Sequence, residues 1–112
     1  MLKVWTAQMR YPGKDRLDIT VKSGTQAFAP SWPMVIGFKD GSIDEEGYTW
    51  RYKNLMEKSK QVFFAQWEDL LKREEVTLVC YCPAGAFCHR ILLAKMLEEQ
   101  FGVQYMGERS LT

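Results

Sequence analysis

The sequence predicts an α/β fold, with a small, mainly parallel sheet flanked by helices in a Rossmann-like three-layer arrangement. Residues 76–82 are rich in β-branched side chains and nearly uncharged, which is typical of a strand covered on both faces. From residue 88 to residue 101 the apolar side chains recur at helical spacing instead, so the strand leads into a helix through a short loop. The chain of 112 residues suits a single α/β domain spanning residues 1–112.

The first part of the chain predicts two short strands followed by a long loop. Residues 2–9 alternate weakly and run into a turn that contains Pro12 and Gly13, and residues 17–21 form a second short apolar run. Residues 23–41 are interrupted repeatedly by glycine and proline. We therefore expect an irregular segment there, and loops of this length are usually functional.

The middle and the end of the chain predict three helices and a last strand. Ser42 and Glu45 have the spacing of a capping box, so a helix is expected from there to about residue 59. A second helix is expected near residues 61–72. Gly102 is expected to end the helix that begins at residue 88, and residues 103–106 can form a final strand. The side chains expected to face the core in the first two helices are Tyr48, Tyr52, Leu55, Met56, Phe63, Trp67, Leu70 and Leu71.

Composition excludes several classes of partner. The 15 basic and 14 acidic residues are mixed along the chain, so no basic stripe for duplex nucleic acid is expected. No apolar run approaches the ~18 residues of a membrane span, and the N-terminus lacks a signal-peptide core. We therefore expect a cytoplasmic protein without a membrane partner. An odd number of cysteines, clustered at Cys80, Cys82 and Cys88, favours reduced thiols over a disulfide framework.

The start of the last predicted helix is the main candidate site. Ligands of open α/β sheets bind beyond the carboxyl ends of the strands, and Cys88, His89 and Arg90 lie at such a position. Unpaired helix amides and the helix dipole favour an anion there and favour thiolate over thiol. We predict a small phosphate-bearing or nucleotide-like ligand. If the protein is an enzyme, Cys88 is the predicted nucleophile, His89 the acid or base, and Arg90 the group that holds negative charge.

Further ligand contacts are expected from the loop before this helix and from the ends of the first two strands. Gly85 allows close approach of the backbone to a ligand. The other candidates for ligand binding are Arg10, Tyr11, Lys22, Ser23 and Cys82.

Structural roles are the alternative for the same residues. Cys88 can be a simple helix cap, Arg90 a partner of Glu108, and His89 a hydrogen-bonded structural histidine, while Cys80 resembles a buried small apolar residue. A second alternative is a non-catalytic interaction domain that uses the aromatic loop 28–38.

A small metal site is a third alternative, because Cys80, Cys82, Cys88 and His89 are four soft or borderline ligands. Two observations speak against a metal site: only one strand residue separates Cys80 from Cys82, and the sequence has no second pair of ligands elsewhere. We therefore expect neither a bound metal nor a cofactor.

Three common motifs do not match. The loop has no Gly-Lys-Ser/Thr of a P-loop, and Gly85 stands alone where a dinucleotide fingerprint has several glycines. Arg90 follows Cys82 by eight positions and Cys88 by two, whereas the phosphatase loop has its arginine six positions after the cysteine.

Segments of this chain resemble the domain-of-unknown-function 488 family. The resemblance is carried by Leu78-Val79-Cys80-Tyr81, by Cys88-His89-Arg90 and by Leu92-Leu93-Ala94. It is strongest over residues 76–107, and the segments at 18–20 and 29–31 look like a shortened first half of the family. The resemblance implies a compact α/β sheet with Cys-His-Arg at the carboxyl end of a strand, and it implies no particular reaction. Cys82 and the glycine-containing loop depart from the family's commoner acidic residue and charged loop.

Overall fold

The computed structural model, which describes residues 2–83 and 86–109, confirms the α/β class. Its sheet has four strands in the order β2-β3-β1-β4, and every pair is parallel. The strands are β1 (Lys3–Gln8), β2 (Arg16–Asp18), β3 (Glu75–Cys80) and β4 (Gln104–Glu108). Because β3 has neighbours on both edges, its residues from Val76 to Cys80 are all buried, as the apolar run predicts.

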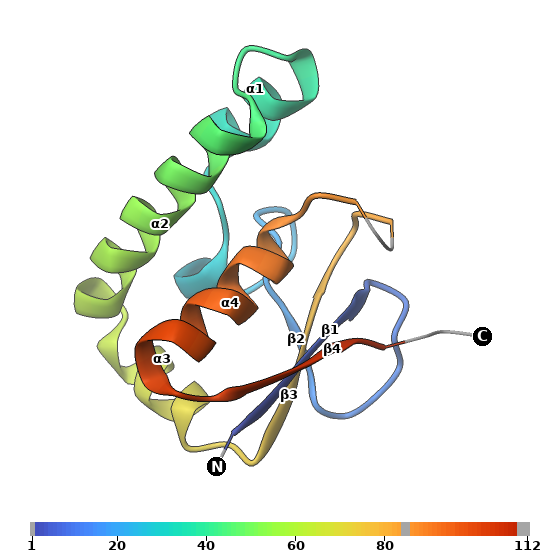
Figure 1. The fold of residues 1–112 in the computed structure, drawn as a ribbon, viewed down its shortest axis with the longest axis vertical. Helices are drawn as coiled ribbons and strands as arrows, with labels where there is room; N and C mark the ends of the chain where they lie inside the picture. Colours follow the sequence, from blue (N-terminus) through green and yellow to red (C-terminus); the bar gives the residue numbers. More distant parts are fainter. Residues whose placement is uncertain (1, 84–85, 110–112) are drawn as a thin grey trace.

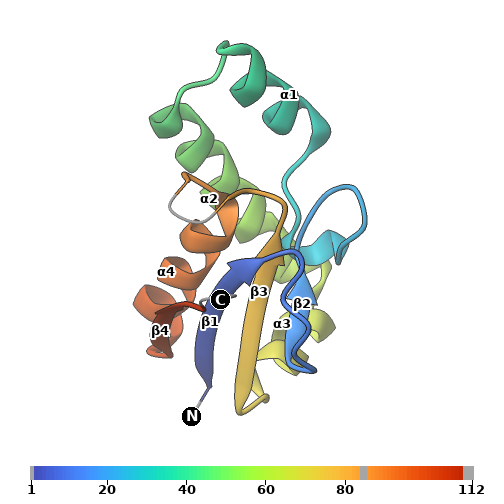
Figure 2. The ribbon, with the colours of Figure 1, turned by 90° about the vertical axis from the view of Figure 1, so that its right-hand side faces the viewer.

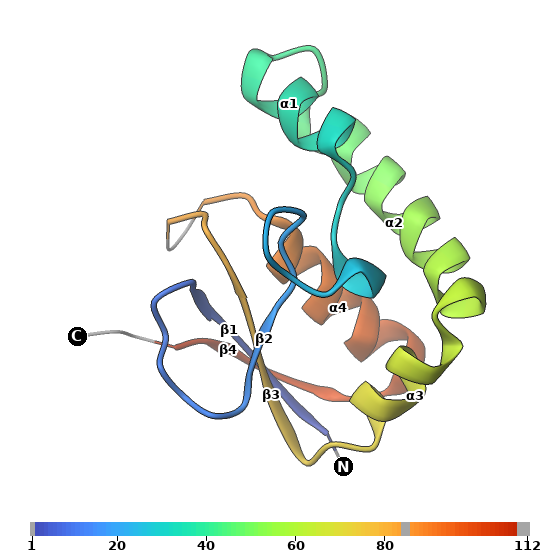
Figure 3. The ribbon, with the colours of Figure 1, turned by 180° about the vertical axis from the view of Figure 1, so that it is seen from behind.

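The helices stack on one another against one face of this sheet. They are η1 (Gln26–Phe28), α1 (Trp32–Asp40), α2 (Glu45–Val62), α3 (Phe64–Leu71) and α4 (His89–Phe101). Helix α4 packs on β1, β3 and β4, and the long helix α2 packs on α4, so α4 lies between α2 and the strands in Figures 1 and 3. One continuous core joins them, including Val4, Leu78, Leu93, Leu97, Tyr52 and Trp67. In the described part of the chain, no helix is long and apolar enough to cross a membrane.

The other face of the sheet is covered by the connection between β1 and β2 instead of by a helix. Asp15 of this connection accepts a hydrogen bond from the Thr77 hydroxyl of β3 at 2.6 Å and another from Tyr11 at 2.7 Å. The guanidinium of Arg109 donates to Thr77 at 2.9 Å and stacks 4.0 Å from the centroid of the Trp5 ring. Figure 2 looks onto this face, with the helices behind the strands. The Rossmann-like three-layer part of the prediction is therefore not confirmed.

The prediction of an irregular loop over residues 23–41 is wrong, because the segment holds η1 and α1. The side chain of Ser31 caps α1 by accepting from the amide of Met34, and Pro33 lies in the first turn. Gly41, with φ 85°, ends the helix in the left-handed conformation. The residues that suggested a loop are thus the start and stop signals of a short helix.

The predicted capping box at Ser42 is also wrong. Asp44 is the N-cap of α2 and accepts from the amide of Gly47 at 2.7 Å. Glu45 and Glu46 follow in the first turn, where the helix dipole favours negative charge. The hydroxyl of Ser42 donates to the carbonyl of Gly37, so it serves the end of α1 and not the start of α2.

The remaining elements agree with the sequence analysis to within a few residues. Phe63 separates α2 from α3, and Gly102, with φ 68°, ends α4. The second strand covers Arg16–Asp18 and stops before Ile19, and β3 ends at Cys80 instead of at residue 82. The shorter β3 matters for the site, because it places Cys82 in the loop that follows.

Candidate ligand-binding site

A cavity of about 360 Å³ opens beyond the carboxyl ends of β2 and β3. Its volume falls in the range of small-molecule sites, and its position is where open α/β sheets bind ligands. The described residues that line it are Thr20, Val21, Lys22, Pro30, Trp32, Val35, Phe38, Lys39, Tyr48, Cys80, Tyr81, Cys82, Pro83, Phe87, Cys88 and His89.

Aromatic rings from three parts of the chain form the walls. Phe38 of α1 packs 5.2 Å from the ring of Phe87 and 5.5 Å from that of Tyr48, which belongs to α2. Phe87 and Tyr48 complete the triangle at 5.6 Å in an edge-to-face contact. Trp32 and Tyr81 also line the cavity, and about half of the Trp32 surface is exposed. Mutual ring contacts therefore fix part of the wall and leave other rings free to meet a ligand.

The charge of the cavity is positive. Lys22, after β2, and Lys39, near the end of α1, line it, and no carboxylate does so among the residues that the structure describes. The ammonium of Lys22 also lies 5.9 Å from the centroid of the Tyr81 ring. Lys22 and Lys39 therefore place positive charge beside the aromatic walls.

A hydrogen-bonded turn after β2 supports the rim. The carboxylate of Asp18 accepts from the amide and hydroxyl of Thr20 and from the hydroxyl of Ser23, which lies 3.2 Å from the Tyr81 hydroxyl. Partial burial alone would raise the pKa of Asp18, but hydrogen bonds from Ser23 and Thr20 outweigh it and leave the pKa below its usual value. A Cβ on Gly24 would stand 2.5 Å from the Thr20 nitrogen, so only glycine fits this turn.

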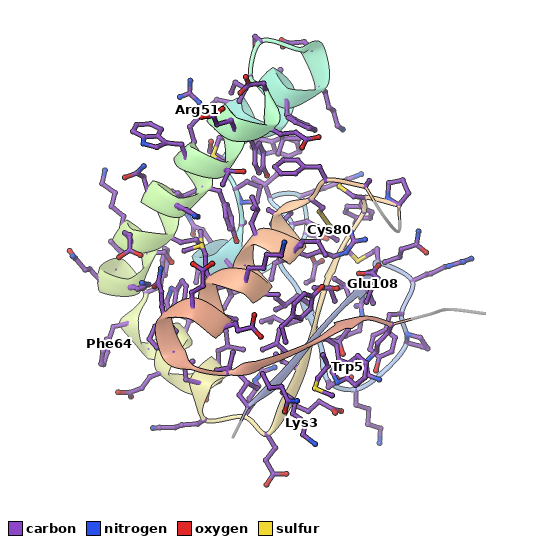
Figure 4. The ribbon with its side chains drawn as sticks, viewed as in Figure 1. Lys3, Trp5, Arg51, Phe64, Cys80 and Glu108 are labelled. Carbon is purple, nitrogen blue, oxygen red and sulfur yellow. A yellow bond between two sulfur atoms is a disulfide. The ribbon has the colours of Figure 1, made fainter. Side chains whose placement is uncertain are left out.

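The three cysteines meet at the floor of the cavity. Cys80 ends β3 and Cys88 is the N-cap of α4, and the structure joins them in a disulfide, so the expectation of reduced thiols is wrong for this pair. Their Cα atoms are 7.9 Å apart, beyond the roughly 4.4–6.8 Å of most disulfides. Cys82 is free and half-buried, and the three sulfur atoms lie within 4.8 Å of one another. Figure 4 labels Cys80 in this cluster.

Burial raises the pKa of Cys82, and the nearby cations of Arg90 and Lys39 only partly oppose this. Cys82 is therefore a neutral thiol at neutral pH.

His89 is buried and held in one orientation. Its Nε2 lies 2.7 Å from the carbonyl oxygen of Ile19, and because a carbonyl only accepts, Nε2 carries the proton. Nδ1 then has a free lone pair and lies 3.7 Å from the sulfur of Cys88. Burial lowers the pKa of His89 to about 4, since the favourable bond to Ile19 does not compensate fully, and the Arg90 charge lowers it further. The ring is neutral at physiological pH.

Arg90 lies beneath the cavity and does not line it. Its side chain is fully buried, and its guanidinium pairs with the Glu108 carboxylate of β4 at 2.9 Å, the alternative partner given by the sequence. It also donates to the sulfur of Cys80 at 2.9 Å and to the carbonyls of Cys82 and Pro83 at 3.0 and 3.2 Å. Arg90 thus ties the end of β3, the following loop and β4 together, and Figure 4 labels Cys80 and Glu108 at this end of the sheet.

The other candidate residues are only partly brought together. Lys22 and Cys82 line the cavity, and Ser23 reaches it through the Tyr81 hydroxyl. Arg10 is exposed in the turn after β1, and Tyr11 belongs to the network on the opposite face of the sheet. Gly85 lies outside the described residues.

Helices α1 and α2 contribute cavity residues that were not expected from the sequence. Trp32, Val35, Phe38 and Lys39 recur at helical spacing and form the inner side of α1, while Tyr48 was assigned only to the core. The spacing was present in the sequence, but the interpretation of residues 23–41 as a loop concealed it.

Comparison with known proteins agrees with the resemblance seen in the sequence. The family model DUF488-N3a, described as "Active DUF488-N3 subclade", matches residues 1–101, which is most of the chain. No curated protein and no solved structure matches the chain significantly.

Proposed function

The chain belongs to the DUF488-N3a family, and from that premise we propose that its cavity binds a small anionic, nucleotide-like molecule. One observation carries the proposal: aromatic walls and the two cations of Lys22 and Lys39 converge on one cavity, with no carboxylate among its described lining residues.

Each part of such a ligand has a counterpart in the cavity. A planar base can stack on an exposed ring such as Trp32, a contact worth ~1–3 kcal/mol per base. A phosphate can pair with the ammonium groups of Lys22 and Lys39 in charge-assisted hydrogen bonds. The combination favours a nucleotide over a purely apolar molecule or a bare inorganic anion.

Ligand binding by the cavity is better supported than a reaction in which Cys88 is the nucleophile and His89 the base. An ordinary thiol has a pKa near ~8.5, whereas burial lowers the pKa of His89 to about 4. The imidazole is therefore a poor base for the Cys88 thiol, which is also buried and bonded to Cys80. The word "active" in the family description supports a reaction, and the free thiol available to a bound molecule is that of Cys82.

Isothermal titration calorimetry with the four nucleoside monophosphates tests the proposal. We expect binding of at least one of them, and Trp32→Ala should weaken it ~10-fold or more because a stacked ring is lost. Trp50→Ala is the matched control, since Trp50 is 65% exposed and lies outside this cavity. Lys39→Gln should also weaken binding, whereas Lys95→Gln on the outer side of α4 should not.

A bound nucleotide should also slow alkylation of Cys82 by iodoacetamide, because the thiol lies on the cavity wall. Absence of binding for all four nucleotides, or equal affinity in the Trp32→Ala and wild-type proteins, would reject the proposed ligand class.

A second candidate is a protein-interaction surface, favoured by exposed apolar side chains on the outer side of α1 and α2. Ile36 and Trp50 are 57% and 65% exposed. Of the loop 28–38 considered from sequence, Phe28 and Pro30 are buried, so only α1 remains available for a partner. Ile36→Glu separates the two candidates, because Ile36 does not line the cavity and its replacement should leave nucleotide binding unchanged.

A further inference from the structure

We propose that Cys80, Cys82 and Cys88 in their reduced form, together with Nδ1 of His89, bind one Zn²⁺ ion in a tetrahedral site. The site is independent of the nucleotide-like ligand, because all four donor groups come from the chain itself.

Three of the four donor atoms, the cysteine sulfurs, lie in one cluster, and the fourth, Nδ1 of His89, lies next to the Cys88 sulfur of that cluster. With Zn–S of ~2.3 Å and Zn–N of ~2.0–2.1 Å, neighbouring ligand atoms of a tetrahedral site lie about 3.5–3.8 Å apart. The sulfur of Cys88 and Nδ1 of His89 are 3.7 Å apart, and the three sulfurs lie within 4.8 Å of one another. The Cα atoms of Cys80 and Cys88, 7.9 Å apart, suit two cysteines bridged by a metal better than two joined directly.

The histidine has the orientation of a metal ligand. Metal-bound histidines almost always donate their second ring N–H to a carbonyl or carboxylate, which fixes the tautomer and the direction of the free lone pair. Nε2 of His89 makes this bond to the carbonyl of Ile19 at 2.7 Å, and Nδ1 faces Cys88. The bond to Ile19 therefore fixes the tautomer in which Nδ1 can donate its lone pair to a metal ion.

The charges around the cluster also fit. Three thiolates and Zn²⁺ carry a net charge of −1, and a buried charge needs a partner. The guanidinium of Arg90 donates to the sulfur of Cys80 at 2.9 Å, so a cation already touches the cluster. Lys39, which lines the same cavity as Cys82, adds positive charge from the cavity side.

The position of Cys82 differs from the one that spoke against a metal. From the sequence, Cys80 and Cys82 were expected on one strand, with no second pair of ligands. In the structure β3 ends at Cys80, and the following loop brings Cys82 back beside Cys88 at the start of α4. Sulfur donors from a strand end, a loop and a helix start thus lie within 4.8 Å of one another.

The oxidation state decides whether the site exists. Reduction of the Cys80–Cys88 disulfide takes two electrons, which a phosphine reductant supplies, and two protons, which come from the water molecule whose oxygen ends in the phosphine oxide. Binding of Zn²⁺ then displaces the three thiol protons. Protein that retains the disulfide lacks two of the four ligands and should not bind the ion.

Anaerobic titration of the full, phosphine-reduced chain with Co²⁺ tests the site. We expect saturation at one equivalent, with the visible bands of tetrahedral Co²⁺, a sulfur-to-cobalt charge-transfer band, and displacement of both by Zn²⁺. Protein oxidised with diamide should show none of these bands. A reduced protein that binds no Co²⁺, or binds it without a charge-transfer band, would overturn the proposal.

Variants identify the ligands. Cys82→Ser should lower Co²⁺ affinity ~10-fold or more, and Cys82 is only half-buried, so the exchange disturbs packing little. Tyr81→Phe is the control. It removes only the hydroxyl of the residue between Cys80 and Cys82 in the chain, and this variant should bind one equivalent of Co²⁺ with wild-type affinity. X-ray absorption of the wild-type zinc protein avoids any dependence on variant folding and should give three sulfur ligands and one nitrogen. Wild-type affinity in Cys82→Ser, or a zinc shell without sulfur, would refute the assignment.

Discussion

The side chain of Arg90 shows how a charged residue at a candidate site can act as a structural tie. We expect Arg90→Ala to lower the free energy of unfolding by about 3–5 kcal/mol, because the change leaves the Glu108 carboxylate and two loop carbonyls without their donor. Urea denaturation of both proteins at neutral pH measures the difference.

Two further variants control this prediction. Arg51→Ala removes an exposed arginine from α2 and should change stability by less than ~0.5 kcal/mol. Arg90→Lys should recover little, because one ammonium group cannot reach carboxylate and carbonyls together as a guanidinium fork does. If Arg90→Ala instead unfolds at the wild-type urea concentration, Arg90 has no structural role and the anion-binding role predicted from sequence regains support.

At this scale the sequence locates residues better than it orients them. Cys88 and His89 were expected at a helix start beyond a buried strand, and they lie there beside the cavity. The direction of the Arg90 side chain depends on Glu108, which lies 18 residues later in the chain. Tyr11 lies on the face of the sheet opposite the cavity, because the chain folds back over the sheet after β1. Local patterns do not contain such long-range partners.

The start of α2 provides a test at the scale of a single element. Asp44→Ala should lower the free energy of unfolding by ~0.5–2 kcal/mol, because the amide of Gly47 loses its capping carboxylate. Ser42→Ala should cost less, since the Ser42 hydroxyl makes only a partly buried bond to the Gly37 carbonyl. Thermal melts of the two variants in parallel report the order, and a larger loss in Ser42→Ala would restore the capping box expected from the sequence.

Elements whose apolar residues recur at one regular spacing could be predicted from the sequence. Elements that also contain glycine or proline, which are typical of loops, could not. The strand β3 and the helix α4 have uninterrupted patterns and clear ends, so both were expected nearly in place. The helix α1 contains Gly37, which has no side chain and so leaves room for the side chain of Ile43. A Cβ at position 37 would lie only 2.5 Å from Cδ1 of Ile43. A glycine needed for packing looks like a loop signal when the packing partner is unknown.

At the scale of the whole molecule, the sheet has helices on one face and a polar network on the other. The network predicts an acid sensitivity. Burial alone would raise the pKa of Asp15, but hydrogen bonds from Thr77 and Tyr11 outweigh it and leave the pKa below its usual value. A carboxyl group with a lowered pKa stabilises the folded state above its unfolded pKa of ~3.9, and this contribution is lost as the pH falls through the folded value.

Asp15→Asn should therefore flatten the dependence of stability on pH below about 4, and its stability should be lower than that of the wild type at pH 7. Urea unfolding at several pH values measures this dependence. Asp69→Asn, on the exposed side of α3, is the matched control and should keep the wild-type slope. An unchanged slope in Asp15→Asn would mean that the network does not depend on the ionised carboxylate.

The parallel sheet could be predicted from the burial pattern of one strand, but its one-sided helical cover could not. A strand such as β3 looks the same in sequence whether a helix or a polar loop covers its second face. The cover includes Asp15 and Arg109, which are far apart in the chain and meet at the hydroxyl of Thr77 on β3. Only the completed topology brings them together.

The tie between Arg90 and Glu108 also sets the order in which the site is completed during protein synthesis. The ribosome makes the cavity walls of α1 and α2, the cysteine loop and α4 before it makes β4. Until β4 pairs with β1, Arg90 lacks the carboxylate that holds its guanidinium against the loop carbonyls. We therefore expect that a nascent chain that has not yet exposed residues 104–108 lacks the contact that fixes Arg90 and the loop above it, and that this end of the cavity becomes ordered only when β4 has joined the sheet.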